Sequence, residues 1–354
     1  MRPEQLLCAT PVGLYCARGR FHIDPLQPVE RALITHAHAD HARPGHTEVM
    51  ATAQTLALMR IRYGDNFAHT SQSIAYGETV WLDGVGVTFH PAGHVLGSAQ
   101  ILVQHGGLRM VASGDYKNVR DPTCVPFELV RCDVFITEAT FGLPVFRHGD
   151  PAKEIGKLLR SIATFPDRAH VIGAYSIGKS QRLLALLRES AYDRPIYLHG
   201  ALEAVTRYYV DQGIDVGDVR PVRGHSKSDL TGAVALCPPS ALRDRWVRGF
   251  SDPVTAFASG WMRVRARARQ QGATLPLVIS DHADWDDLTA TIAATGAPQI
   301  WVTHGQEDGL VRWCELHGLA AQPLRIVGYG EEDDGAGLAG DPTSPSDPDP
   351  AGDR

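Results

Sequence analysis

The first 140 residues contain several short runs of β-branched and aliphatic residues, punctuated by glycine, aspartate and asparagine. Runs of this length and composition predict β-strands that end in turns. We therefore expect the first part of the chain to be rich in β-sheet. The predicted strands cover residues 31–36, 79–90, 100–105, 108–115 and 132–139.

Beyond residue 150, helical periodicity alternates with short apolar runs, which is typical of an α/β protein. No obvious linker divides the chain, so we expect a second domain to be inserted rather than appended. Residues 195–275 alternate short strands with helices and contain Pro/Gly breaks. The other predicted elements are helices at 153–164, 180–190, 284–296 and 307–319, and strands at 170–175, 275–280 and 298–305.

The composition of the 354 residues is 44% hydrophobic and 21% charged, which is typical of a soluble globular protein with a sizeable core. No apolar run approaches the length of about 18 residues that a transmembrane helix requires. The N-terminal residues lack the pattern of a secretory signal, and the six cysteines form no CxxC pair. We therefore expect reduced thiols, no membrane contact and a cytoplasmic location.

The acidic charge is concentrated at residues 331–354, which hold eight acidic residues and one arginine, with no aromatic residue. Such a segment cannot bury enough apolar surface to fold, so we predict a disordered tail. The other 330 residues hold 33 basic and 32 acidic residues. This near-neutral body does not by itself indicate a nucleic-acid-binding protein.

The strongest chemical signal is the motif His36-Ala-His38-Ala-Asp40-His41, which follows a predicted strand. His36 and His38 are two residues apart and can point to the same side to hold one cation. Asp40 and His41 then face a neighbouring cation. Imidazole and carboxylate groups together are typical zinc ligands.

Three more candidate ligands follow predicted strands elsewhere in the chain. His94 lies in Pro91-Ala-Gly-His94, where the glycine permits a sharp turn. Asp115 ends the run Ser113-Gly-Asp115, and a carboxylate there could bridge two cations. His304 closes the strand Ile300-Trp-Val-Thr-His304. Strand–loop junctions are where α/β proteins build their sites, so these residues are expected to converge with the first motif.

Together these motifs resemble the metallo-β-lactamase fold. Three further elements resemble the β-CASP nucleases within it: Glu138 in Thr-Glu-Ala-Thr-Phe-Gly resembles motif A, His282 in Ser-Asp-His-Ala-Asp resembles motif B, and His304 in Thr-His-Gly resembles motif C. The run 174–182 (AYSIGKSQR) resembles the phosphate-side loop and helix start of the inserted β-CASP domain. The likeness covers roughly residues 5–328 and is closest to the bacterial ligase-associated DNA exonucleases.

The resemblance implies an αββα metallo-β-lactamase sandwich with an inserted α/β β-CASP domain. The first part of the metallo-β-lactamase domain is expected at 1–167 and its return segment at 275–330. The inserted domain is expected at 168–274, and the acidic tail at 331–354.

The resemblance also implies a role for each motif residue. His36, His38 and His94 would hold one zinc ion, Asp40, His41 and His304 a second, and Asp115 would bridge the two. Asp40, Glu138 and His282 are expected to act in catalysis. Glu138 would orient a ligand histidine, and His282 would contact the scissile phosphate or protonate the leaving oxygen.

Two zinc ions suit the in-line hydrolysis of a phosphodiester by activated water. The chain is therefore expected to be a zinc-dependent DNA exonuclease of DNA repair, associated in function with a DNA ligase and a helicase. Histidine at motif C is associated more with the RNA enzymes of this superfamily. His304 therefore keeps an RNA-processing ribonuclease open as the alternative.

Residues 173–180 also match the P-loop pattern G-x-x-x-x-G-K-[ST]. A P-loop ATPase would leave the seven candidate zinc ligands unexplained. A glycine turn at a helix N-terminus is nevertheless an anion site, so Gly178, Lys179 and Ser180 are predicted to hold a substrate phosphate. A hydrolase of small substrates and a scaffold with a structural metal remain further alternatives.

Arginines alternate at 263, 265, 267 and 269. On a strand these side chains would share one face, whereas on a helix they would spread around it. Arg263 and Arg265 are predicted to contact a nucleic-acid backbone. Trp261 and Tyr175 are candidates for stacking on bases.

Overall fold

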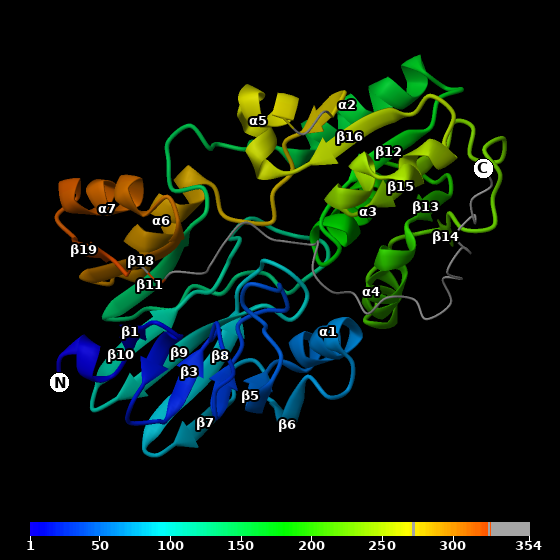
Figure 1. Cartoon of the computed structure of the whole chain (residues 1–354). Helices are drawn as coiled ribbons and strands as arrows, with labels where there is room; N and C mark the ends of the chain where they lie inside the picture. The colour runs from blue at the N-terminus through cyan, green and yellow to red at the C-terminus, as the bar shows by residue number, and fades with distance from the viewer. Residues whose placement is uncertain (271–272, 325, 327–354) are drawn as a thin grey trace, which may run out of the picture.

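The computed structural model describes residues 1–270, 273–324 and 326 (Figure 1). The predicted acidic tail at 331–354 lies outside the described residues. The described residues form three β-sheets with helices packed against them, which confirms the predicted α/β class.

The first sheet has the strand order β1-β2-β3-β4-β5-β6 and follows a short 3₁₀ helix, η1 (Pro3–Gln5). β1 to β3 pair antiparallel, and β3 to β6 pair parallel. Helix α1 (Ala53–Tyr63) packs on the outer face of this sheet through Leu56 and Met59. The strands are β1 (Cys8–Thr10), β2 (Gly13–Cys16), β3 (Phe21–Ile23), β4 (Arg31–Leu33), β5 (His46–Ala51) and β6 (Ala68–Ser73).

The second sheet has the order β19-β18-β11-β10-β9-β8-β7. Helices α6 (Trp285–Thr295) and α7 (Glu307–Leu316) cover one of its faces, where Leu288 and Leu310 pack against Phe135 and Ile300. The strands are β7 (Thr79–Leu82), β8 (Val85–Pro91), β9 (Ala99–His105), β10 (Leu108–Ala112), β11 (Val134–Ala139), β18 (Gln299–Gly305) and β19 (Ala320–Pro323).

One hydrophobic core joins the first two sheets face to face. Phe21, Leu33 and Met50 of the first sheet are fully buried against Phe89 and Ile101 of the second. The layers therefore run helix, sheet, sheet, helix, and burial of both inner faces supplies the main driving force for this packing. The two sheets occupy the lower part of Figure 1.

The third sheet is entirely parallel, with the order β14-β13-β15-β12-β16-β17. Helix α2 (Pro151–Thr164) buries Ile155, Leu158 and Ile162, which recur at the spacing of one helical face. Helices α3 (Lys179–Glu189) and α4 (Gly200–Asp211) complete the same apolar layer. The strands are β12 (His170–Gly173), β13 (Ile196–Leu198), β14 (Val219–Pro221), β15 (Val234–Cys237), β16 (Val254–Ala258) and β17 (Leu275–Leu277).

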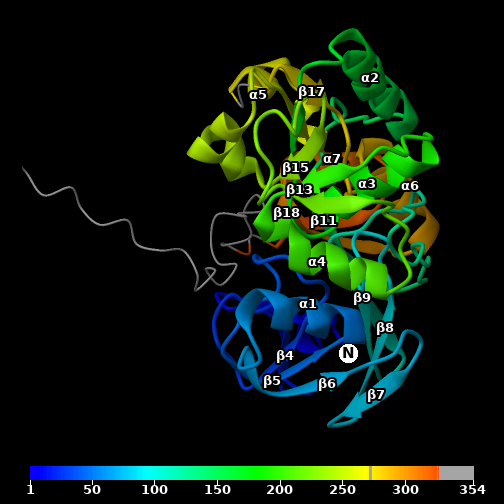
Figure 2. The same cartoon turned by 90° about the vertical axis from the view of Figure 1, so that its right-hand side faces the viewer.

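Short helices lie around the third sheet. They are η2 (Pro239–Arg243), η3 (Arg245–Gly249), η4 (Gly260–Arg263) and α5 (Arg265–Gln270). Leu242 packs with Met262 and Ala268 in one small cluster, so η2 lies close to η4 and α5. Figure 2 shows α4 of this region lying directly over α1 of the first, and the two helices are in contact.

Some predicted elements differ from the observed ones. The strand predicted at 79–90 is a hairpin, β7 and β8, because Asp83 and Gly84 both adopt positive φ angles (49° and 81°) that make a tight turn. The strand predicted at 275–280 ends at Leu277, where the chain turns toward the site. No helix among the described residues is both long and apolar enough to cross a lipid bilayer.

Candidate metal centre

Seven imidazole and carboxylate side chains converge at the ends of strands from the first two sheets. His36, His38, Asp40 and His41 lie in the loop between β4 and β5. The other three residues come from three strands of the second sheet: His94 follows β8, Asp115 follows β10, and His304 lies in β18. The structure thus brings together all seven residues predicted from the motifs.

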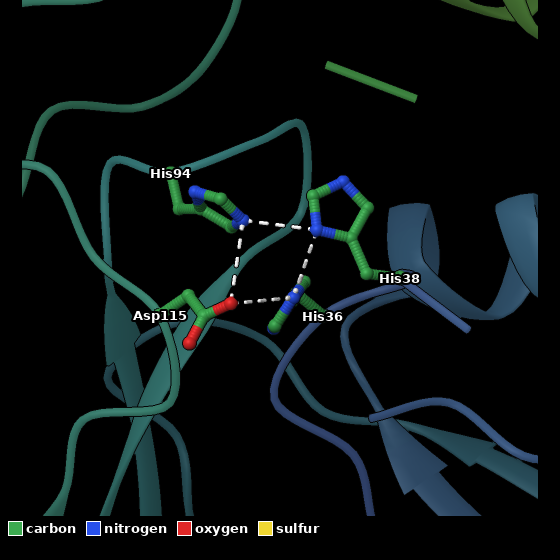
Figure 3. A group of neighbouring side chains, drawn as sticks. All are labelled: His36, His38, His94 and Asp115. Carbon is green, nitrogen blue, oxygen red and sulfur yellow. Dashed lines mark hydrogen bonds and ion pairs between the residues drawn. The ribbon is translucent and has the colours of Figure 1, made fainter. Parts of the chain in front are cut away.

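Four of these side chains form a compact group, shown in Figure 3. His38 Nδ1 lies 3.2 Å from His36 Nε2 and 3.1 Å from His94 Nε2. Asp115 Oδ2 lies 3.5 Å from His36 Nε2 and 3.9 Å from His94 Nε2. The four donor atoms face one another, as the ligands of one cation would.

A second group contains Asp40, His41 and His304. Asp40 Oδ2 lies 3.5 Å from His304 Nε2 and 3.8 Å from His41 Nε2. Asp115 reaches this group too, with Oδ2 at 3.4 Å from His41 Nε2 and Oδ1 at 4.0 Å from His304 Nε2. Asp115 therefore lies between the two groups, where a carboxylate can bridge two cations.

The ring nitrogens that point away from the two groups have partners of their own. His36 Nδ1 lies 3.0 Å from Thr35 Oγ1, and His38 Nε2 lies 3.1 Å from the Ile177 carbonyl. His94 Nδ1 lies 3.0 Å from the Asp281 carbonyl. Such outer contacts fix the tautomer and orientation of a ligand histidine.

Asp24, which belongs to none of the motifs, supports His41 in the same way. Its Oδ2 lies 2.7 Å from His41 Nδ1, and its carboxylate accepts hydrogen bonds from the backbone N–H (2.8 Å) and Oγ1 (2.6 Å) of Thr35. Asp24 is buried and has a positive φ of 44°. Asp24 lies in the stretch Phe21-His22-Ile23-Asp24-Pro25, outside the motifs that carried the chemical prediction.

His282 and Glu138 form a pair beside the two groups. His282 Nδ1 lies 3.0 Å from Glu138 Oε2 and 3.9 Å from Asp115 Oδ2. Glu138 also accepts a hydrogen bond from the backbone N–H of Tyr116 at 2.8 Å. The histidine that Glu138 contacts is thus His282, not one of the five histidines in the two groups.

The charges at the centre are strongly coupled. Burial opposes a charge on His41, but Asp115, Asp40 and Asp24 outweigh it and hold the pKa of His41 well above its ordinary value. Burial likewise opposes ionisation of Asp115, but His304 and His41 hold its pKa well below the usual range. Burial lowers the pKa of His94 to about 4, which keeps its ring neutral and able to bind a metal.

The donor set fits divalent cations. Both carboxylate oxygens of Asp40 and Oδ1 of Asp115 are buried and accept no hydrogen bond from the part of the chain that the structure describes. A buried carboxylate without a hydrogen bond is costly unless a cation compensates it. The nitrogen and oxygen donors, without sulfur, suit zinc.

A cavity open to solvent lies against the two groups, between the second sheet and the third. Asp40, Asp115, His282 and His304 form one side of it. The remaining lining residues are Thr140, Phe141, Tyr175, Lys179, Ser259, Trp261, Arg267, Gly305 and Gln306.

The predicted anion site at Gly178–Ser180 lies at the start of α3. Of its three residues, only Lys179 lines the cavity. Lys179 Nζ lies 3.1 Å from Asp281 Oδ1 and 4.1 Å from the centre of the Tyr175 ring. The Ser180 hydroxyl donates to the Tyr175 carbonyl at 2.7 Å, and the backbone N–H of Gly178 donates to Gln181 Oε1 at 2.9 Å.

The arginine run spans η4 and α5, so its side chains do not share one face. Arg263 and Arg265 are exposed and do not line the cavity. Arg267, which was not among the predicted substrate contacts, does line it, with its guanidinium carbon 3.8 Å from the centre of a Trp261 ring. Trp261 and Tyr175, the candidates for base stacking, both line the cavity.

Comparison with curated proteins points to nucleic-acid enzymes. The chain is 34% identical over 319 residues to a probable DNA ligase of Opitutus terrae, a match that covers 87% of the chain and 30% of that relative. It is 23% identical over 391 residues to a ribonuclease of Thermus thermophilus, which covers 88% of the chain and 89% of the relative. Such relatives support the prediction of a metal-dependent hydrolase.

The match to the ligase-named protein thus spans less than a third of that relative's length. A scan against models of known protein families finds no match. A crystal structure of a protein of unknown function from Enterococcus faecalis shares the fold, with a TM-score of 0.53, 13% identity, and coverage of 77% of this chain and 74% of that one.

Proposed function

We propose that this chain is a two-zinc phosphodiesterase of the metallo-β-lactamase/β-CASP family that hydrolyses nucleic acid. The observation that carries the proposal is the pair of donor groups that share Asp115. One ion would be held by His36, His38 and His94. The other ion would be held by Asp40, His41 and His304, and Asp115 would bind both ions. When bound, two zinc ions lower the pKa of water toward neutrality and offset the charge that develops on the phosphoryl oxygens.

The chain's own residues position and protonate the substrate. Glu138 engages His282 Nδ1, which fixes the orientation of the imidazole, and His282 lines the cavity. We therefore assign to His282 Nε2 the transfer of a proton to the leaving oxygen, or a contact with the scissile phosphate. An imidazole suits general acid catalysis near neutral pH because its ordinary pKa is about 6.5.

The family assignment accounts for the layers described above. Residues 1–167 and 275–330 would form the αββα metallo-β-lactamase domain, and residues 168–274 the inserted β-CASP domain. The cavity has walls from both parts, which supports the binding of an extended strand between them. Of the predicted phosphate contacts, Lys179, Arg263 and Arg265 remain proposed, whereas the Gly178 N–H and the Ser180 hydroxyl already donate within the protein.

DNA is the first candidate substrate, and the support is the 34% identity to a protein named a DNA ligase. We propose exonuclease action in DNA repair, in the cytoplasm and in functional association with a ligase and a helicase. RNA is the second candidate, because a relative that matches along 89% of its own length is named a ribonuclease and because His304 occupies the position of motif C.

The test is digestion of end-labelled single strands of matched DNA and RNA, each with and without a 5′-phosphate. We expect DNA to be shortened from an end. A chelator should stop the reaction, and added zinc should restore it. Cleavage of RNA alone would replace the first candidate with the second. Absence of cleavage of either strand by protein that holds two metal ions would overturn the proposal of a nuclease.

A further inference from the structure

Two long cationic side chains line the cavity in the described structure, and they differ in how far they are exposed. Lys179 is 3% exposed, and its ammonium group forms an ion pair with the buried Asp281. Arg267 is half-buried at the cavity wall, and its guanidinium carbon lies 3.8 Å from the centre of a Trp261 ring.

We propose that Arg267, supported by Trp261, binds the substrate phosphate that adjoins the scissile one and so selects a nucleic-acid strand. This inference rests on the proposed nuclease function and names a residue outside the motifs that predicted it. A guanidinium group can bind a phosphate through two parallel N–H donors, and its planar shape stacks on an aromatic ring.

Trp261 provides a rigid support. Its ring packs against Phe141 (4.8 Å between centroids) and Phe146 (5.0 Å), and its backbone N–H donates to Ser259 Oγ at 3.3 Å. These contacts fix the indole, and the indole in turn restricts the guanidinium of Arg267. A restrained side chain loses less conformational entropy when it binds a ligand. Trp261 is thus a positioning residue for Arg267.

The segment that carries Arg267 is strongly basic. Arg263, Arg265 and Arg269 are exposed on η4 and α5, which also contain Trp261 and Arg267. A strand whose scissile phosphate lies at the proposed metal ligands and that passes Arg267 would run close to this basic segment. Positive charge along such a path attracts a phosphate backbone without regard to base sequence.

The experiment measures binding of a labelled single-stranded DNA oligonucleotide to chelator-treated protein over a range of salt concentrations. Because no cleavage occurs under these conditions, binding is read separately from catalysis. We expect Arg267→Ala to weaken binding about tenfold and to reduce the slope of log K against log salt by about 0.7, the value for one phosphate contact on a single strand. Arg267→Lys should recover only part of the affinity, because an ammonium group neither stacks on an aromatic ring nor forms bidentate hydrogen bonds with a phosphate.

Arg207→Ala, which removes the same charge from an exposed position on α4, is the matched control and should leave binding unchanged. Trp261→Ala should weaken binding in the wild-type background but have little effect when Arg267 is already alanine. Circular dichroism confirms that each variant is folded. Equal binding by Arg267→Ala and Arg207→Ala would overturn the inference, as would weaker binding with an unchanged salt slope.

The outcomes also separate this inference from the proposed function. If the wild type cleaves strands but Arg267→Ala binds them normally, the inference fails and the nuclease proposal stands. If Arg267→Ala shows the expected loss of binding but the metal-loaded wild type cleaves no strand, the nuclease proposal fails and a phosphate-binding role for Arg267 remains.

Discussion

Four of the five histidines in the proposed zinc sites are held by a specific outer contact. Oxygen atoms from Thr35, Ile177, Asp281 and Asp24 face the nitrogens of His36, His38, His94 and His41 that do not point into the two groups. Only Asp24 among these partners supplies a carboxylate, and it serves the proposed second site. The second site should therefore depend on Asp24 more than the first site does.

We predict that Asp24→Asn lowers the affinity of the second zinc ion by about 10–100-fold, with little effect on the first, because the amide supports His41 less strongly than the carboxylate does. Competition with a chromophoric chelator measures both affinities. Asp83→Asn, which removes a carboxylate from an exposed ion pair with Arg20, is the control. Equal affinities in Asp24→Asn and the control would contradict this role.

The sequence predicted the site at this scale because ligand residues must be of a few types at fixed spacing. Motifs identify His36, His38, Asp40 and His41 without knowledge of the fold. Backbone carbonyls such as that of Asp281 have no sequence signature, since every residue carries one. Arg267 could not be distinguished from Arg263 and Arg265, because only the η4–α5 geometry decides which arginine reaches the cavity.

At the scale of elements, tight turns aim the ligands after their strands end. Gly93 has a φ of +71°, and a Cβ atom at this position would overlap the Lys117 carbonyl and lie 2.9 Å from the Phe127 nitrogen. Gly305, directly after His304, has a φ of +125° and is equally crowded by Ala139. These glycines permit backbone approaches that no other residue allows.

We predict that Gly93→Ala destabilises the protein by about 2 kcal/mol more than Gly77→Ala. Both positions have nearly the same φ (71° and 77°), so alanine has a similar backbone conformational cost at each. Gly77 faces open space, so at that position alanine has no steric cost in addition. The extra cost at Gly93 is the steric overlap. Urea unfolding measures both changes, and equal destabilisation would show that the loop before His94 relaxes freely.

His46 in strand β5 makes the stability of the fold depend on pH, and it is not one of the proposed metal ligands. His46 is 1% exposed, and its Nδ1 accepts a hydrogen bond from the backbone N–H of Val29. Burial lowers the pKa of His46 to about 4. The unfolded chain therefore binds a proton more readily than the folded one between pH 4 and pH 6.5, and this contribution to stability declines as the pH falls through that range.

We predict that the unfolding free energy of the wild type falls by on the order of 1 kcal/mol more than that of His46→Gln between pH 6.5 and pH 5. Denaturant titrations at each pH measure this difference. The exposed His69→Gln on β6 is the matched control and should follow the wild type. Parallel pH profiles for the wild type and His46→Gln would contradict the assignment.

The periodicity of the sequence predicted long, regular elements better than short ones. Helix α2 was predicted because its apolar residues recur on one face. Strands β1 to β3 have only three or four residues each, too few for a periodic signal, and were not predicted. Helix α1 was also not predicted, although Thr52 caps it by accepting the backbone N–H of Thr55.

At the scale of the whole molecule, a single apolar cluster ties the third sheet to the ligand loop. Ala37, which lies between His36 and His38, packs with Val95, Ile177 and Tyr209. Ile177 precedes α3 and Tyr209 lies in α4, so the proposed inserted domain contacts the metal loop directly. Sequence alone could not predict these contacts, because apolar residues such as Ala37 and Ile177 belong to no motif that marks them as partners.

Metal removal should therefore affect the stability of the entire protein. We predict that chelation lowers the melting temperature by several degrees, because ligands between residues 36 and 304 lose the cations that hold them and because cation binding stabilises only the folded state. Calorimetry with chelator and then with added zinc measures the shift and its reversal. Asp115→Asn should show a smaller shift. A melting temperature that is indifferent to chelation would contradict a structural role for the ions.

In the proposed mechanism, two metal ions that share Asp115 as a ligand drive phosphodiester hydrolysis. The most direct measurement titrates chelator-treated protein with zinc and follows the bound metal and the cleavage of an end-labelled strand in the same samples. We predict that cleavage develops fully only as the second equivalent binds, and that Asp115→Asn neither binds two equivalents nor cleaves. Full cleavage by metal-free protein, or by Asp115→Asn, would contradict the account.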